Sequence, residues 1–135
     1  GCSRRQRQMC IRDSNKACPR ALLILCAPVS SLNDWFNSEK EDPVLIDVRE
    51  QSELQLARFS KEFLHIPISK VTSEYVEEIF AGLLDREIVV TCHAGIRSYN
   101  FCQWCLDNNI VSEIWNLEEG IDGWSKYIDP SIPRY

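Results

Sequence analysis

Residues 87–98 read EIVVTCHAGIRS and connect an aliphatic run to a helical pattern through a short loop. Residues 87–91 are expected to form a strand that is covered on both faces, as strands of a parallel sheet are. Residues 97–109 then follow a helical period. The sequence therefore predicts a strand, a short loop and a helix, with Cys92 as the first residue after the strand.

Strands and helices are expected to alternate on both sides of this unit. Further strands are expected at residues 44–48, 63–68 and 113–117, and the second of these is expected to be peripheral because it contains a proline. Helices are expected to begin at Ser30 or Ser31, Ser52, Ser73, Arg97 and Gly120. This order indicates an α/β fold with a mainly parallel central sheet and helices on both faces.

The composition excludes several classes of protein. The chain has 135 residues, a formal net charge of -5, 44% hydrophobic and 26% charged residues, and no apolar run long enough to span a membrane. A basic nucleic-acid-binding domain and a membrane partner are therefore not expected. Seven cysteines are many, but a chain of this length needs no disulfide framework, so reduced cysteines and a cytoplasmic location are predicted.

The first residues differ from the rest of the chain. Residues 4–13, RRQRQMCIRD, match the translation of a common sequencing adapter, so residues 1–14 are interpreted as a segment outside the fold. Residues 15–135 then carry 11 cationic and 19 acidic side chains, a net charge of -8. Residues 15–26 are an N-terminal extension whose nature the sequence leaves open: the apolar run at 21–27 could be a signal sequence, a buried first strand or a remnant of the upstream junction. The domain itself is assigned to residues 27–135.

The loop after the expected strand has the features of an anion-binding site. Its backbone N–H groups can turn inward, the helix N-terminus adds positive potential, and Arg97 adds a full charge. Gly95 permits backbone angles that a Cβ would forbid, and Ser98 can cap the helix or hydrogen-bond the sulfur. Such a loop would stabilise a thiolate on Cys92. The alternative is that Cys92 is only a small buried hydrophobic residue.

Three ordered blocks of the sequence resemble the single-domain rhodaneses, a family of sulfurtransferases. The family's active-site pattern Cys-x-x-Gly-x-Arg-Ser stands here at residues 92–98. Residues 45–50, LIDVRE, are similar to the family's early strand and turn, and residues 117–124, LEEGIDGW, to its C-terminal signature. The segment 65–67, HIP, also matches a family position. The resemblance covers about residues 27–135 and implies the rhodanese-like α/β fold.

The resemblance implies a sulfurtransferase with Cys92 as the catalytic nucleophile and no metal or organic cofactor. Cys92 would take the outer sulfur of thiosulfate or of a persulfide and pass it to a thiol or to cyanide; a sulfur-relay protein is a candidate partner. Asp47 is expected to pair with Arg97 or the loop. Arg49 either supports the loop or substrate, or pairs with Glu50 or Glu53. The residues expected to bind substrate are His93, Ala94, Gly95, Ile96, Arg97 and Ser98.

Other functions on the same fold remain alternatives. Related phosphatases place five residues between the nucleophilic Cys and the Arg, whereas only residues 93–96 separate Cys92 from Arg97 here. The smaller ring favours sulfur over a phosphoryl group. An arsenate reductase and a non-catalytic binding module are the further alternatives, and retention of Cys92 argues against the binding module.

Several other residues have two interpretations. Cys102 and Cys105 form a C-x-x-C pattern, but they share one helical face with Phe101 and are expected to be core residues rather than a zinc or redox motif. Cys102 could also act as a resolving cysteine toward oxidised Cys92. His93 could donate a hydrogen bond or carry a proton. Trp115 and Trp124 are expected to pack in the core.

Overall fold

The computed structural model describes residues 23–135, in which five parallel strands form one sheet. In spatial order the strands are β1 (Leu23–Ala27), β5 (Glu113–Leu117), β4 (Ile88–Thr91), β2 (Val44–Asp47) and β3 (Leu64–His65). The helices are α2 (Val29–Phe36), α3 (Gln51–Leu54), the short 3₁₀ helix η1 (Ile68–Lys70), α4 (Ser73–Ala81), α5 (Ile96–Asp107) and α6 (Gly120–Tyr127). The predicted α/β fold with a parallel sheet is confirmed.

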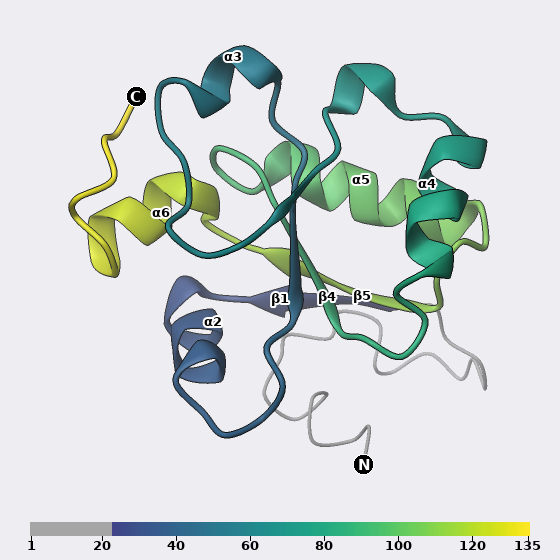
Figure 1. Cartoon of the computed structure of the whole chain (residues 1–135), viewed down its shortest axis with the longest axis horizontal. Helices are drawn as coiled ribbons and strands as arrows, with labels where there is room; N and C mark the ends of the chain where they lie inside the picture. Colours follow the sequence, from purple (N-terminus) through teal and green to yellow (C-terminus); the bar gives the residue numbers. More distant parts are fainter. Residues whose placement is uncertain (1–22) are drawn as a thin grey trace.

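Helices cover both faces of the sheet because successive strand residues point to opposite sides. Figure 1 shows α4 and α5 on one side of the strands and α2 on the other. Leu25 and Trp115 belong to the core on the side of α2 and α6. Their strand neighbours Ile24 and Ile114 belong to the core beneath α4 and α5. Each such fully buried aliphatic side chain contributes about 1.5–3 kcal/mol, so two hydrophobic layers hold the sheet.

Strand β4 lies at the centre of the sheet and ends next to two other strand ends. Its neighbour β2 aligns Asp47 with Thr91, and β5 on the other side aligns Asn116 with Val90. Since all three strands are parallel, Cys92 emerges at the same edge as the residues that follow β2 and β5. Functional groups of an open parallel sheet are expected at this edge.

The N-terminal stretch that the sequence left open contains part of the sheet. Strand β1 pairs with β5 from Leu23 to Ala27, and all its residues are buried. Residues 23–26 thus contribute to the hydrophobic core. The segment assigned to residues 1–14, together with residues 15–22, lies outside the described part of the chain.

Helix α2 begins earlier than the serine pattern predicted. Its first residue is Val29, and Pro28 stands at the N-cap without a side-chain capping bond. The backbone N–H groups of Ser31 and Leu32 both donate to the carbonyl oxygen of Pro28. The fixed φ of proline suits a helix entrance, and Val29 is buried, so packing sets the start of this helix.

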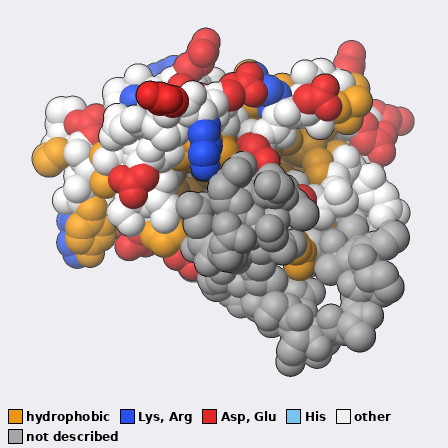
Figure 2. Space-filling model, turned by 90° about the horizontal axis from the view of Figure 1, so that it is seen from below, with side chains coloured by type: hydrophobic (Ala, Val, Ile, Leu, Met, Phe, Trp, Pro, Cys, Tyr) orange, Lys and Arg blue, Asp and Glu red, His pale blue; other side chains and the backbone are white. Residues whose placement is uncertain are grey.

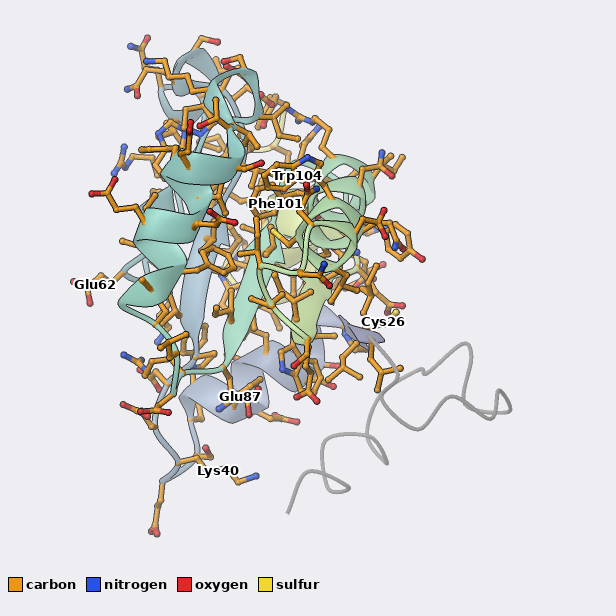
Figure 3. All side chains as sticks on the ribbon, turned by 90° about the vertical axis from the view of Figure 1, so that its right-hand side faces the viewer. Cys26, Lys40, Glu62, Glu87, Phe101 and Trp104 are labelled. Carbon is orange, nitrogen blue, oxygen red and sulfur yellow. The ribbon has the colours of Figure 1, made fainter. Side chains whose placement is uncertain are left out.

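The helices and the surface of residues 23–135 have the following features. No helix in this range is long and apolar enough to cross a membrane. Acidic side chains occur at several separate places on the face seen in Figure 2. Figure 3 labels Phe101 and Trp104 on α5, whose stacked rings have centroids 6.1 Å apart and pack with the core beneath this helix.

Candidate active site

The sulfur of Cys92 lies inside a ring of hydrogen-bond donors. The backbone N–H of Gly95 donates to Sγ at 3.1 Å, and the backbone N–H of Ser98 donates at 3.3 Å. The hydroxyl oxygen of Ser98 is also 3.3 Å from Sγ. Cys92 is only 1% exposed. Neutral donors aimed at one sulfur can stabilise negative charge on a thiolate without placing a cation against it.

The path of the loop depends on a left-handed backbone conformation at Gly95. This residue is the N-cap of α5 and has φ of 100°. A Cβ at this position would overlap the carbonyl oxygen of Glu118. Any other residue would therefore strain the backbone and push the loop away from the turn between β5 and α6.

That turn holds the loop from the other side. The backbone N–H of Ile121 donates to the carbonyl oxygen of Cys92 at 2.9 Å, and that of Asp122 donates to the carbonyl oxygen of His93 at 3.0 Å. Gly120 has φ of 62°, and a Cβ there would overlap the carbonyl oxygens of Cys92 and His93. The N-terminus of α6 therefore donates hydrogen bonds to the outward-facing carbonyls of the loop. The N–H groups of Gly95 and Ser98 face the sulfur on the other side.

Asn116 is a site residue that the sequence did not single out. It is 3% exposed, and its Oδ1 accepts a hydrogen bond from the Ser98 hydroxyl at 2.5 Å. Its Nδ2 donates to the carbonyl oxygen of Gly95 at 3.2 Å. An asparagine between Trp115 and Leu117 in a buried strand was the available signal, because a buried amide needs partners. Of the two roles predicted for Ser98, the contact with sulfur is present, and Gly95 takes the N-cap position.

Arg97 is held by Glu53, and the predicted pairing of Asp47 with Arg97 is wrong. Its Nη1 and Nη2 donate to the two carboxylate oxygens of Glu53 at 2.8 and 2.9 Å. These hydrogen bonds lower the pKa of Glu53 from 4.5 to about 2. They also raise the pKa of Arg97, so both groups are charged at neutral pH. Helix α3 places Glu53 within reach, whereas Asp47 has a nearer partner.

That partner is Arg49, for which the sequence offered two roles: support of the loop or contact with substrate, or an ion pair with Glu50 or Glu53. The side chains of Asp47 and Arg49 are both 0% exposed, and Arg49 Nη2 lies 2.7 Å from Asp47 Oδ2. The backbone N–H and Nε of Arg49 also donate to Asp47. The chain bends back after β2, so the ion pair forms across two residues. The ion pair with Asp47 and the complete burial fit a supporting role for Arg49.

Tyr135 joins both arginine pairs and was not predicted. Its hydroxyl accepts a hydrogen bond from Arg49 Nη1 at 3.1 Å and donates one to Glu53 Oε1 at 2.8 Å. Its ring stacks on His93, with centroids 4.1 Å apart and planes 12° apart. The Nε2 atom of His93 is buried without a hydrogen-bond partner among the described residues. No local pattern at the end of the sequence signals these contacts.

Of the other candidate site residues singled out from the sequence, two lie in the loop and two lie in the hydrophobic core. Ala94 and Ile96 lie on the exposed side of the loop. Cys102 and Cys105 lie in the core, as predicted, and burial raises the pKa of Cys105 to about 12. The Cys102 thiol donates to the carbonyl oxygen of Trp115 at 3.6 Å. Among residues 23–135, no group of three or more His, Cys, Asp or Glu side chains could hold a metal ion.

Comparisons with known proteins give matches over most of this chain. The family model described as "Rhodanese-like domain" matches residues 30–127. A chloroplastic rhodanese-like/PpiC domain-containing protein of Arabidopsis thaliana is 31% identical over 80% of this chain, and the match covers 38% of that protein. The chain thus spans well under half of that relative.

Shorter relatives are covered more fully. A sulfurtransferase of Allochromatium vinosum is 27% identical over 70% of this chain and 83% of its own length. The crystal structure of a rhodanese-like domain protein from Staphylococcus aureus covers 82% of this chain and 97% of its own, with a TM-score of 0.55 and 17% identity. The structural likeness supports the fold.

Proposed function

The chain belongs to the rhodanese-like domain family, and we propose that it is a sulfurtransferase that carries sulfur as a persulfide on Cys92. The observation that carries this proposal is the set of donors around Sγ from Gly95 and Ser98. Distant relatives named as sulfurtransferases support the same activity.

In the first step, the Cys92 thiolate attacks the outer sulfur of the donor. With thiosulfate, the S–S bond of the donor breaks, sulfite leaves with the bonding electron pair, and Cys92–S–S⁻ forms. The backbone N–H groups of residues 95 and 98 donate to Sγ. They would stabilise the charge of the attacking thiolate, which is a form of preorganised electrostatic stabilisation. Arg97 is close enough to interact electrostatically with Cys92.

In the second step, an acceptor removes the outer sulfur and restores the Cys92 thiolate. Cyanide yields thiocyanate, and a thiol yields a new persulfide. This is covalent catalysis in two half-reactions, for which Cys92 suffices without a metal or an organic cofactor. A small thiol or a sulfur-relay protein is the proposed acceptor, and the cytoplasm the proposed location; a relative in Drosophila willistoni is named an adenylyltransferase and sulfurtransferase.

The decisive experiment measures sulfur on Cys92 directly. The protein is incubated with thiosulfate, and intact-mass and peptide spectra are expected to show one added sulfur on Cys92; cyanide then releases thiocyanate. The Cys92→Ser variant is expected to show neither. The matched control is Cys105→Ala, which alters another buried cysteine outside the loop and is expected to retain both reactions.

Other outcomes would replace this proposal. Absence of sulfur on Cys92 with thiosulfate and with persulfide donors would overturn it, as would full activity of Cys92→Ser. Turnover of an aryl phosphate above background would favour the phosphatase alternative. Partner capture that survives Cys92→Ala, without any sulfur transfer, would favour a binding module.

A further inference from the structure

The arginines around the Cys92 loop are each paired with a carboxylate. Arg97 pairs with Glu53, and Arg49 pairs with Asp47. Arg134 pairs at 2.9 Å with Asp122, whose backbone N–H binds the loop at His93. The positive charge that the sequence assigns to this region is thus balanced by acids within the fold.

The Glu53 carboxylate is fixed in place. Besides Arg97, its oxygens accept hydrogen bonds from the backbone N–H of Glu50 at 3.0 Å and from the Tyr135 hydroxyl at 2.8 Å. These bonds include a capping box at the start of α3. Arg49 Nη1 further anchors the same residue through its carbonyl oxygen at 3.3 Å. Glu53 therefore cannot leave Arg97 without the loss of several hydrogen bonds.

This arrangement disfavours a small dianion. Glu53 uses both terminal nitrogens of Arg97, and this two-point geometry is the one through which an arginine would hold the oxygens of thiosulfate. Thiosulfate carries two negative charges. It must either displace Glu53 or bind the N–H groups of Arg97 that Glu53 leaves free, and in both cases it approaches the fixed Glu53 charge. A hydropersulfide, R–S–S–H, carries at most one negative charge on its sulfurs.

The donors around the Cys92 sulfur are suited to a single negative charge. The donors to Sγ are the backbone N–H groups of Gly95 and Ser98, with the Ser98 hydroxyl oxygen beside them, and none of these groups carries a formal charge. Neutral donors suit a single charge on sulfur, which is what the loaded cysteine needs. They provide less for a dianion, whose second charge would have to be met by a cation.

We infer that Glu53, through its bidentate pairing with Arg97, makes the Cys92 site selective for hydropersulfide donors over thiosulfate. The inference rests on the proposed sulfur transfer and names its donor class. In the reaction, the Cys92 thiolate attacks the outer sulfur of R–S–S–H, the S–S bond breaks, R–S⁻ leaves with the bonding pair, and Cys92–S–S–H forms. Glu53 is a positioning residue that acts through Arg97.

The test measures the second-order rate of Cys92 loading by mass spectrometry with three donors. These are thiosulfate, cysteine persulfide as a small donor, and a persulfidated peptide as a stand-in for a protein-borne donor. Wild type is expected to load faster from at least one persulfide than from thiosulfate. Glu53→Gln is expected to raise the thiosulfate rate about tenfold, because it removes one charge at short range from a dianion. Its persulfide rates are expected to change by about twofold or less, as for a weakly charged partner.

Two controls separate selectivity from general charge and from folding. Glu78→Gln removes an exposed acid of α4 and is expected to leave the ratio of thiosulfate to persulfide rates unchanged. The salt dependence of thiosulfate loading is compared between wild type and Glu53→Gln, because the net negative charge of residues 15–135, which is -8 in wild type, repels a dianion in both. As ionic strength falls, loading is expected to slow more steeply in wild type than in Glu53→Gln.

The outcomes are distinguishable. Wild-type preference for thiosulfate, the same salt dependence of thiosulfate loading in both proteins, or equal changes of all rates in Glu53→Gln would overturn the assignment of Glu53 while leaving sulfur transfer intact. Failure of every donor to load Cys92 would overturn the proposed function itself.

Discussion

Asn116 bridges Ser98 and Gly95: its Oδ1 accepts from the Ser98 hydroxyl at 2.5 Å, and its Nδ2 donates to the Gly95 carbonyl oxygen at 3.2 Å. One amide on β5 thus ties together the two residues whose N–H groups face the Cys92 sulfur. A hydroxyl has a single proton, and the short bond to Asn116 engages it. The backbone N–H groups of Gly95 and Ser98 then remain as the donors to the sulfur.

Replacement of Asn116 should affect stability and activity together. Asn116→Ala leaves the Ser98 hydroxyl and the Gly95 carbonyl without their buried partner, so the free energy of unfolding should fall by about 1–3 kcal/mol. Cys92 loading should slow because the loop is less ordered. Urea unfolding and mass spectrometry measure the two effects. Asn108→Ala, which removes an exposed bond to the Trp104 carbonyl, is the control, and equal effects of both variants would contradict the role of Asn116.

The two glycines at helix ends should respond differently to alanine. Gly95→Ala places a Cβ on the Glu118 carbonyl at a φ of 100°, so we expect a loss of stability of about 1–3 kcal/mol and strongly reduced loading of Cys92. Gly82→Ala meets only the Ile79 carbonyl oxygen at 3.6 Å and should be nearly neutral. Thermal unfolding and loading rates of the pair provide the test. Full activity of Gly95→Ala would show that the loop tolerates another path.

The Arg97–Glu53 pair should make stability depend on acid pH. The pKa of Glu53 is lowered from 4.5 to about 2 in the folded protein. The ion pair therefore contributes fully to the free energy of unfolding above pH 4.5, and this contribution is lost as pH falls from 4.5 toward 2. Glu53→Gln should therefore be less stable than wild type at pH 6, by about 1 kcal/mol, with a smaller difference at pH 3. Urea titrations at several pH values measure this, with Glu78→Gln as the control. A difference that stays constant between pH 6 and pH 3 would argue against the pair.

Cys105 should reduce stability at alkaline pH. Burial raises its pKa from 9.0 to about 12, so the folded protein keeps a neutral thiol that the unfolded chain loses. Stability is then highest below pH 9 and falls as pH rises toward 12, by up to about 1.4 kcal/mol per pH unit. Between pH 8 and 10.5, Cys105→Ala should lose less stability than wild type in urea unfolding. Parallel losses in the two proteins would contradict this explanation.

The sequence predicted best where local rules and tertiary packing agree. The strand at residues 113–117 and the start of the helix at Gly120 are as predicted, because the buried run ends at Leu117 and a glycine with positive φ follows the turn. The cysteine loop was also predicted, since the strand end, Gly95 and Ser98 are close in sequence. The start of α2 was not, because packing of Val29 prevailed over the capping preference of Ser30 and Ser31.

The ionic partners needed the tertiary structure. From the sequence alone, more than one arginine could have paired with Asp47. The bend of the chain after β2 brings the Arg49 side chain against the Asp47 carboxylate. Asn116 contacts the loop because the register aligns it with Val90 near the end of β4. Tyr135 meets His93 across more than forty intervening residues, and no periodicity expresses such a contact.

The close main-chain contacts on both sides of the loop restrict how its length can change. Gly95 faces the Glu118 carbonyl without space for one added carbon, and Gly120 faces the carbonyls of Cys92 and His93 in the same way. An inserted residue between Cys92 and Arg97 would push the widened loop into the turn before α6. Redesign of this protein to accept a larger oxyanion therefore requires both segments to be lengthened together, because either insertion alone meets fixed backbone.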